Sequence, residues 1–461
     1  VTPGLAARKP LGLLPDGKRP RALVNWVGAG ADTTGIGAIG LELLDGEARA
    51  AAILRALDSN GTATLPVEVS TRRETIALSL PIPVADIGQA ARLPGPLALP
   101  ETALAEDHLA PYLVGLAALP GVGVRQIGRS FEGRSLAAIE LTAPQDGRIW
   151  SRIKASLHKP TLLISARHHA NEPASTHAAL ALAARYATDP ARMAIRDRVN
   201  IAILPLENAD GAALHAAMRR EHPTWKHHAA RYNAVGREFA RDYYDAEAPW
   251  GEARARPRLW REWLPDVVVD NHGVPSHEWN QHFNGFGSPP RFGVSYWLVS
   301  ALLYGILRYP TTDPAHAAFA EAARDRIAAA VADDAEIFAA NGQIRDVYER
   351  WGHQRLPERF PATYHREMLW YFGPQPAEAR ARFSRPDGYD RVTVADIVTE
   401  VPDETAQGDY LALVARAHLV ANEALLALLA DLAPSVERSV IATPTGPWLV
   451  LRRQRPMRPQ E

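Results

Sequence analysis

Short apolar runs alternate with longer amphipathic stretches along most of the chain. Four of these runs are bounded by polar or turn-forming residues, as buried strands are. They lie at 161–165, 199–204, 267–269 and 397–399. Two stretches whose apolar residues recur every three or four positions predict helices, at 174–187 and 410–432. Strands that alternate with helices in this way indicate an α/β domain with a mixed, largely parallel sheet flanked by helices.

The first part of the chain, residues 1 to about 105, has a different pattern and is rich in Gly, Ala and Pro. Its predicted elements are one helix and two strands, at 47–57, 65–70 and 75–80. The proline-rich stretch 93–100 suits a linker, because proline fixes φ and lacks a backbone donor. We therefore predict a small N-terminal accessory α/β domain (1–105) and a larger α/β domain (106–461).

The longest apolar run, 294–307, is interrupted by Ser295, Ser300 and Gly305. It is shorter than the roughly 20 apolar residues that a helix needs to cross a bilayer. The run therefore predicts a buried helix and no membrane insertion. A further helix-rich segment, at 311–350, is expected to cover the domain or to be an insertion in it.

Composition narrows the chemistry that the chain can carry. Of its 461 residues 47% are hydrophobic and 22% charged, which is ordinary for a globular protein. The net charge of -1 supplies no global field that would attract nucleic acid. The chain has no cysteine, which excludes disulfides, thiolate metal ligands and a thiol nucleophile. Together with a first residue, Val1, that is not Met, this suits an exported bacterial protein in the periplasm or outside the cell, although a cytoplasmic location is also compatible.

A histidine and a glutamate follow the first predicted strand of the larger domain. His169 and Glu172 are three positions apart, where the strand ends and a helix begins. Open α/β sheets place ligands at this edge, and His with Glu are suitable zinc ligands where cysteine is lacking. With 16 histidines in the chain, such a pair also arises by chance, and a helix-capping Glu beside a partly buried His is the alternative reading.

A third metal ligand is expected, because a catalytic zinc usually has three protein ligands and one open position. His272 follows the strand 267–269 and precedes Gly273, which permits a close turn. His277 and His282 are nearby competitors. Placement at a strand end favours His272, so the sequence predicts one Zn²⁺ held by His169, Glu172 and His272.

Ordered motifs over about residues 108–433 resemble the zinc carboxypeptidase family. They are the hairpin Gly128–Leu136, the pair His169 and Glu172, the turn Asn208–Gly211, the segment Arg231–Arg241 and the remote His272. The turn is similar to the family's Asn-Pro-Asp-Gly, with Ala209 in place of Pro. The resemblance implies zinc-dependent hydrolysis of a peptide or amide bond.

The resemblance also implies roles for charged residues. Arg231 takes the position of the arginine that stabilises the oxyanion, and Arg241 that of the arginine that receives the substrate's terminal carboxylate. Glu238 takes the position of the family's Asp, which accepts a hydrogen bond from the first zinc-binding histidine and so would orient His169. Three other cations lie within range for the oxyanion role: Arg219, Arg220 and Lys226.

The strand at 397–399 ends in acidic residues, as expected for a general base. Glu400 matches the family's catalytic glutamate better than Glu404 does. This carboxylate would take a proton from the water that zinc activates and deliver it to the leaving amine. The family also has a mobile substrate-site tyrosine, and three candidates lie upstream: Tyr364, Tyr371 and Tyr389.

The sequence as a whole predicts a zinc metallocarboxypeptidase that acts on peptides. One departure leaves an alternative open, because Ala240 replaces the family's Asn beside Arg241 and removes a donor that grips a free C-terminus. A zinc amidase or deacylase, similar to desuccinylases, aspartoacylases or cell-wall peptide amidases and acting on an acyl-amide substrate, is that alternative. A non-catalytic binding protein on the same fold is a third reading, and the oligomeric state is not indicated.

Overall fold

The structure is a computed structural model. It describes residues 22–29, 36–43, 64–70, 75–81, 99–143, 151–273, 301–308, 313–351, 362–372, 385–386, 388–455 and 458–459. The expected helix at 47–57 and the competing ligands His277 and His282 lie outside these residues.

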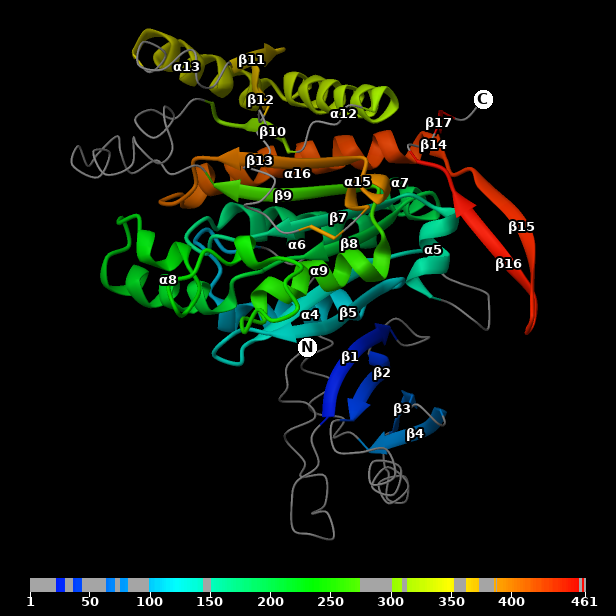
Figure 1. Ribbon diagram of the computed structural model, residues 1–461. Coiled ribbons are helices and arrows are strands. Elements are labelled where there is room, and N and C mark those ends of the chain that lie inside the picture. Colours follow the sequence, from blue (N-terminus) through cyan, green and yellow to red (C-terminus); the bar gives the residue numbers. More distant parts are fainter. Residues whose placement is uncertain are drawn as a thin grey trace.

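A mixed 13-stranded sheet forms the framework of the protein (Figure 1). In spatial order its strands are β11 (Ala362–His365), β12 (Met368–Phe372), β10 (Tyr304–Arg308), β13 (Ala395–Val401), β9 (Val267–Gly273), β7 (Thr161–Ala166), β8 (Asn200–Leu204), β6 (Ser135–Leu141), β5 (Val122–Arg129), β1 (Ala22–Ala29), β2 (Ile36–Leu43), β3 (Thr64–Ser70) and β4 (Thr75–Pro81). The centre, β8-β7-β9-β13, is parallel, whereas most outer ladders are antiparallel. The predicted fold class is confirmed, and each of the four buried runs is a strand of the parallel centre.

One predicted helix is wrong where the structure describes it. The apolar run 294–307 ends in β10, which pairs in parallel with β12 and antiparallel with β13. Gly305 fits this strand, because a Cβ there would lie 2.4 Å from Cζ3 of the Trp370 ring on β12. An apolar run without a clear period does not distinguish a buried strand from a buried helix.

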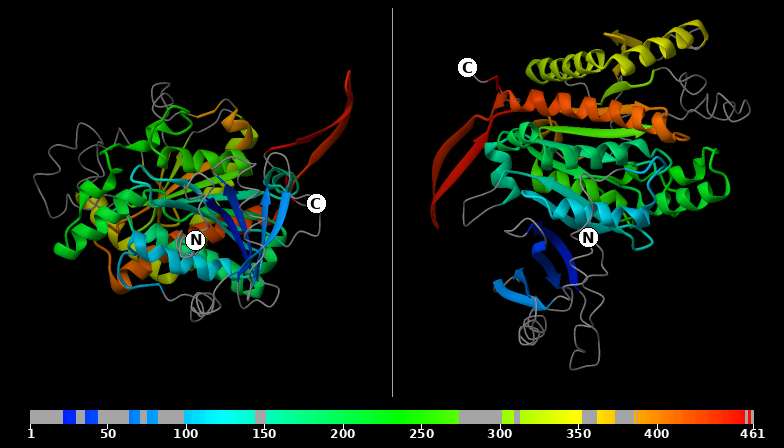
Figure 2. Two further views of the ribbon diagram at one scale, coloured as in Figure 1. Left: turned by 90° about the horizontal axis from the view of Figure 1, so that it is seen from below. Right: turned by 180° about the vertical axis from the view of Figure 1, so that it is seen from behind.

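Helices cover both faces of the sheet (Figure 2). They are α4 (Leu109–Ala117), α5 (Arg152–His158), α6 (Ala174–Thr188), α7 (Pro190–Met193), α8 (Ala209–Glu221), α9 (Glu252–Trp263), α12 (Pro314–Asp333), α13 (Ala335–Trp351), α15 (Tyr389–Val392) and α16 (Gly408–Ala430). Short 3-10 helices are η1 (Glu106–His108), η2 (Ala194–Asp197), η3 (His228–Arg231) and η4 (Phe239–Asp242). Both predicted long helices are present, as α6 and α16, and the predicted helix-rich segment contains α12 and α13.

Side chains alternate between the two faces along β9, and this divides the helices into two layers. Asp270 contacts Arg256 of α9 on one face, while Asn271 contacts Asn422 of α16 on the other. The α9 face also carries the side chain of His272, which contacts Asp270. The side chain of the predicted ligand His272 therefore lies on the face of the sheet that α9 covers.

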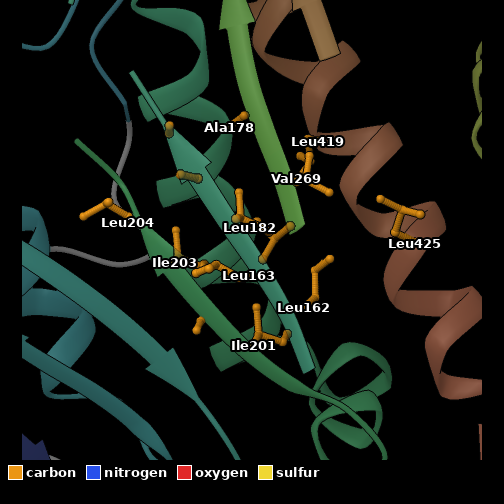
Figure 3. Close-up of a cluster of buried hydrophobic side chains, with 14 of the residues drawn as sticks. Leu162, Leu163, Ala178, Leu182, Ile201, Ile203, Leu204, Val269, Leu419 and Leu425 are labelled. Atoms are coloured by element: carbon orange, nitrogen blue, oxygen red, sulfur yellow. The ribbon is translucent and has the colours of Figure 1, made fainter. Parts of the chain in front are cut away.

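The core lies between the parallel strands and the layer of α6 and α16. Figure 3 shows Leu162 of β7, Ile203 of β8 and Val269 of β9 near Leu182 of α6 and Leu419 of α16, all of them buried. Helix α16 is long and apolar enough to cross a membrane by length and composition, and it packs against α6, α12 and the sheet. One face of α16 is buried against the sheet and others against α6 and α12, which explains its near-continuous apolar sequence.

Both ends of the described chain add strands to the main domain. The expected strands at 65–70 and 75–80 are confirmed as β3 and β4. Strands β2 and β1 lie between them and β5, which β1 contacts through the pair Val27 and Val124. A separate domain at 1–105 stays a prediction. Near the C-terminus, β15 (Val436–Thr443) and β16 (Gly446–Arg453) form a hairpin, and β14 (Leu432–Ala433) pairs with β17 (Arg458–Pro459).

Candidate metal centre

The three predicted ligands lie together at the carboxyl ends of β7 and β9. Nδ1 of His169 is 2.9 Å from Oε1 of Glu172, and Nδ1 of His272 is 3.0 Å from Nδ1 of His169. Nδ1 of His272 also lies 3.3 Å from Oε2 of Glu172. One nitrogen or oxygen from each residue falls within 4.8 Å of the others, and all three side chains are buried.

The chain turns sharply after β7 to bring His169 and Glu172 to this point. Arg167 adopts a left-handed backbone conformation with φ of 56°, and its buried guanidinium donates to the carbonyl oxygens of Ala170 (2.9 Å) and Leu104 (2.6 Å). The backbone N–H of Glu172 donates to the carbonyl of His169 at 3.2 Å, which closes the turn. The spacing of three in the sequence therefore becomes one tight turn between strand and helix.

Each histidine contacts a carboxylate through its outward nitrogen. Nε2 of His169 lies 3.1 Å from Oε2 of Glu238, and Nε2 of His272 lies 2.9 Å from Oδ2 of Asp270. A carboxylate on Nε2 holds the proton there and leaves the Nδ1 lone pair directed inward. Two inward Nδ1 atoms and a carboxylate that converge on one point fit zinc, which takes two His and one Glu in this arrangement.

The charged groups of the centre shift one another's pKa values. Burial acts to raise the pKa of Glu172, but His169, His272 and Arg231 outweigh it and hold that pKa well below its usual range. Burial acts to lower the pKa of His272, and the neighbouring Asp270 and Glu172 carboxylates reverse this and raise it to about 10. The carboxylates are thus ionised and ready to accept a cation.

A buried network that the sequence did not reveal extends behind His169. His168 lies 2.6 Å from Oε1 of Glu238 through Nε2 and 3.1 Å from the Tyr243 hydroxyl through Nδ1. That hydroxyl donates to Oε1 of Glu207 at 2.5 Å. Glu238 therefore bridges two adjacent histidines, and His168 is in turn held by Tyr243. The doubled histidine was the one available signal.

A second network, also missed, lies below His272. Oδ2 of Asp270 accepts from Nη1 of Arg256 at 2.7 Å and from Nη1 of Arg308 at 2.8 Å. Burial acts to raise the pKa of Asp270, but Arg256, His272 and Arg308 hold it well below its usual range. The spacing of two between Asp270 and His272, which puts both on one face of a strand, could have indicated this pair.

Glu400 stands beside the centre, and Glu404 does not. In the parallel ladder between β13 and β9, Glu400 is the register partner of His272. Burial and the nearby Glu172 carboxylate raise the pKa of Glu400 to about 8, against the opposing effect of His272. Glu404 instead accepts a hydrogen bond from Nδ2 of Asn171 at 2.8 Å and is fully buried. The geometry fits Glu400 as the carboxylate of the two that faces the metal ligands.

Arg231 is brought to the ligands by the Asn-Ala-Asp-Gly turn. Its Nη1 donates to Oε1 of Glu172 at 2.8 Å. Asn208 holds this region, because its Nδ2 donates to the carbonyls of Arg231 (3.3 Å) and Tyr232 (3.1 Å). A Cβ at Gly211 would lie 2.7 Å from the carbonyl oxygen of Ala230, so this close approach requires glycine. The motif thus acts as a support for the arginine.

The other candidate cations and tyrosines are placed differently. Arg219 lies in α8 beside His215. Burial, together with the charges of Arg167 and Arg219, lowers the pKa of His215 well below its usual range. Arg241 is exposed in η4, next to Ala240. Tyr389 is buried, donates to Oδ2 of Asp396 at 2.8 Å and stacks on Trp260 at 5.0 Å between ring centroids. That anchoring does not fit a mobile substrate-site tyrosine.

Comparison with known proteins adds a family to this geometry. Residues 116–265 match the family model described as zinc carboxypeptidase. Of the site residues, this segment contains His169, Glu172, Arg231, Glu238 and Arg241, and it ends before His272 and Glu400. A comparison with curated proteins finds no match.

Similar solved structures include a metallo-carboxypeptidase from Burkholderia cenocepacia, with 17% identity, 70% of this chain and 69% of that chain covered, and a TM-score of 0.45. A metallo-carboxypeptidase from Pseudomonas aeruginosa in complex with (2-guanidinoethylmercapto)succinic acid has 15% identity, coverage of 71% and 69%, and a TM-score of 0.44. Bovine thrombin-activatable fibrinolysis inhibitor in complex with tick carboxypeptidase inhibitor has 12% identity, coverage of 71% and 98%, and a TM-score of 0.44.

The family model matches the stretch that contains the His-x-x-Glu pair and the arginine motif, which are the features that carried the resemblance in the sequence. That recognition is therefore confirmed. Over residues 116–265 the chain is therefore similar to the zinc carboxypeptidase family.

Proposed function

We propose that the protein hydrolyses a peptide or amide bond with one zinc ion held by His169, Glu172 and His272. The convergence of two inward Nδ1 atoms, 3.0 Å apart, on the Glu172 carboxylate carries this proposal. A zinc ion held by these residues would lower the pKa of a bound water and polarise the substrate carbonyl. The remaining steps fall to side chains of the chain itself.

Glu400 is the general base in this proposal. Its carboxylate accepts the proton of the attacking water and then transfers that proton to the leaving nitrogen. Its register position opposite His272 places it next to the metal ligands. Without the ion the pKa of Glu400 is raised to about 8, and a bound cation would lower it towards neutrality, where one group can both accept and release a proton.

Arg231 stabilises the negative charge that develops on the carbonyl oxygen. Its guanidinium already points at the centre through Glu172, and it stays charged at all relevant pH values. A fixed donor directed at developing charge contributes more in a buried site than it would in water. The Asn208 support described above limits how far Arg231 moves during the reaction.

Removal of a C-terminal residue is the proposed specificity, with Arg241 receiving the substrate's carboxylate. Arg241 is exposed and available for such a contact, whereas Ala240 offers no side-chain donor beside it. The missing donor favours a zinc amidase or deacylase as the second candidate.

Two matched peptides, one with a free and one with an amidated C-terminus, separate these candidates. The free peptide is expected to be cleaved with a kcat/KM at least about tenfold higher, because only it pairs its carboxylate with a guanidinium. Arg241→Gln should remove that preference, and Arg438→Gln, which changes an exposed arginine of β15, serves as the control. Equal rates on both peptides would rule out the exopeptidase and leave the amidase.

A further inference from the structure

A hollow of about 640 Å³ lies beside α9, and none of the metal ligands lines it. It is formed by the end of β5, by the segment 244–251 and by the exposed side of α9. Four arginines line it: Arg129, Arg254, Arg258 and Arg261. The family resemblance assigns no role to these arginines, and we refer to the hollow as the arginine pocket.

Positive charge exceeds negative charge in the arginine pocket. Two acids line it, Asp245 and Glu262. Oε1 of Glu262 accepts from Nε of Arg258 at 2.9 Å, and its other oxygen is engaged by Arg125. The Asp245 carboxylate accepts a backbone N–H from Glu247 at 2.9 Å. Two more arginines than acids therefore face this space.

The four arginines differ in whether their guanidinium groups already contact other groups of the protein. Arg129 donates to the carbonyl of Gly133 at 2.8 Å, and Arg261 lies over the Tyr244 ring at 5.5 Å. Within the ranges that the structure describes, no side chain pairs with the guanidinium of Arg254. A cation over an aromatic face keeps its N–H donors available at its edge. Arg254 and Arg261 are thus the two groups best able to bind an incoming anion.

The spacing of the arginines favours an extended ligand. Arg254, Arg258 and Arg261 lie four and three residues apart on one face of α9, as the helical repeat requires. They span about 10 Å along the helix axis, at 1.5 Å per residue. Alternate side chains of an extended peptide are about 6.8 Å apart, so two carboxylates of one acidic segment reach both ends of this row. A single small anion contacts only one end.

The pocket also offers apolar surface and lies at the edge of the sheet where the metal ligands are. Phe131, with 51% of its surface exposed, and Tyr244 line it. Phe131 belongs to the turn between β5 and β6, which Asp210 holds through the backbone of Glu132 at 2.9 Å. Tyr244 directly follows Tyr243, the residue that contacts His168. One short segment therefore borders both the metal centre and the pocket.

We propose that the arginine pocket binds an acidic segment of an extended polypeptide, at a position separate from the bond that is cleaved. Guanidinium groups pair with carboxylates through their fork of donors, and the aromatic side chains contact the backbone of the same segment. The proposal rests on the proposed function in one respect, since it takes the bound polypeptide to be the substrate. The binding itself does not depend on catalysis.

Fluorescence anisotropy tests the binding directly. The probes are a labelled hexaglutamate and a labelled hexaglutamine, both acetylated and amidated at their ends, and the protein is the full chain with zinc and Glu400→Gln. Hexaglutamate is expected to bind with an affinity that falls as salt is added, and hexaglutamine to bind at least about tenfold more weakly. Equal affinities for the two peptides would overturn the proposal.

Variants locate the binding. Arg254→Gln with Arg261→Gln should weaken hexaglutamate binding about tenfold or more, while Arg438→Gln with Arg452→Gln removes the same charge from exposed positions elsewhere and should leave it unchanged. An equal loss in both double variants would mean that net charge alone attracts the peptide, and would overturn the proposal. The proposal would also be overturned if inorganic phosphate, at the same concentration as hexaglutamate, displaced that peptide.

Turnover separates this inference from the proposed function. The Arg254→Gln, Arg261→Gln protein should cleave a short neutral peptide at the normal rate and an acidic polypeptide with a raised KM and an unchanged kcat. A chain that binds hexaglutamate but cleaves no peptide would contradict the proposed function and leave the pocket's ligand class standing. If the Arg254→Gln, Arg261→Gln protein and the unmodified protein cleaved the acidic polypeptide with the same KM, the role of the pocket in substrate binding would be contradicted.

Discussion

Glu400 and His272 lie directly opposite each other in the parallel ladder of β13 and β9. The ladder fixes their separation through backbone hydrogen bonds, so neither side chain depends on a loop for its position. Their neighbours Thr399 and Asn271 point to the other face, where Nδ2 of Asn271 donates to Oγ1 of Thr399 at 2.6 Å. A slip of one residue in this ladder would move one of the two functional groups to the other side of the sheet, away from its partner.

Glu400→Gln should abolish hydrolysis and leave zinc bound. The amide keeps the size of the side chain but accepts no proton, and loss of a general base costs about 10²- to 10⁴-fold in rate. Zinc content by atomic emission and kcat/KM on a peptide with a free C-terminus measure the two effects. Retained turnover would show that another carboxylate serves as the base, and Glu404→Gln is the matched variant for that case.

His272→Ala should lower zinc content well below one ion per chain. The change removes one of three ligands and leaves the Asp270 carboxylate without its histidine partner. His158→Ala, an exposed histidine at the end of α5, is the control. Full zinc occupancy in the His272 variant, after dialysis against a chelator of moderate strength, would overturn the proposed ligand set.

Glu238→Gln should weaken zinc binding by about 10- to 100-fold without removing a ligand, as outer carboxylates of metal-binding histidines do. Burial acts to raise the pKa of Glu238, but His169 and His168 hold it well below its usual range, so the group is fully charged in the native protein. Competition with a fluorescent zinc chelator gives the affinity. The same affinity in both proteins would mean that Glu238 does not orient His169.

Acid should destabilise the protein in part through His418. This histidine is buried in α16 beside Thr399, with 2.9 Å between Nδ1 and Oγ1, and burial together with the charge of His272 lowers its pKa to about 3. In the unfolded chain the pKa returns to about 6.5. Between these two values the unfolded state binds the proton and the folded state does not, so stability falls as pH falls from 6.5 towards 3.

The contribution of His418 to the pH dependence of stability follows from the difference between the pH and the pKa of this histidine in the unfolded chain. At pH 5 the contribution of His418 amounts to a loss of about 2 kcal/mol relative to pH 7. His418→Asn keeps a polar contact to Thr399 without a group that titrates in this range, and its stability should fall less between the two pH values. Urea unfolding of zinc-free protein at pH 7 and pH 5 measures the difference. Parallel losses in wild type and variant would contradict the assignment.

Strand ends made much of the centre predictable from the sequence. His169 and His272 each follow a recognisable apolar strand, and parallel strands bring their carboxyl ends to one edge. The supports behind them were not predictable in the same way. Arg256 and Arg308 reach Asp270 from α9 and β10, and nothing in local sequence links those elements. Contacts between residues far apart in the chain depend on how helices pack on the sheet.

The helix predicted at 294–307 is wrong over its described residues, 301–307, for the same reason. Tyr304 to Leu307 is an apolar segment whose conformation is decided by its neighbours β12 and β13, not by its own periodicity. The hairpin of β15 and β16 was also not expected. It exposes Trp448 and Leu449 and lacks the burial that makes strands recognisable in sequence.

The support for His169 and His272 bears on how the protein handles loss of its metal. Both histidines are held by carboxylates and by a sheet whose centre is buried on both faces, so the folded domain does not need the ion as a cross-link. Unlike small zinc domains that unfold when the ion is removed, this one should survive stripping as an intact apoprotein. Removal and return of zinc would then act as a reversible on-off control of activity, reached by dialysis without refolding.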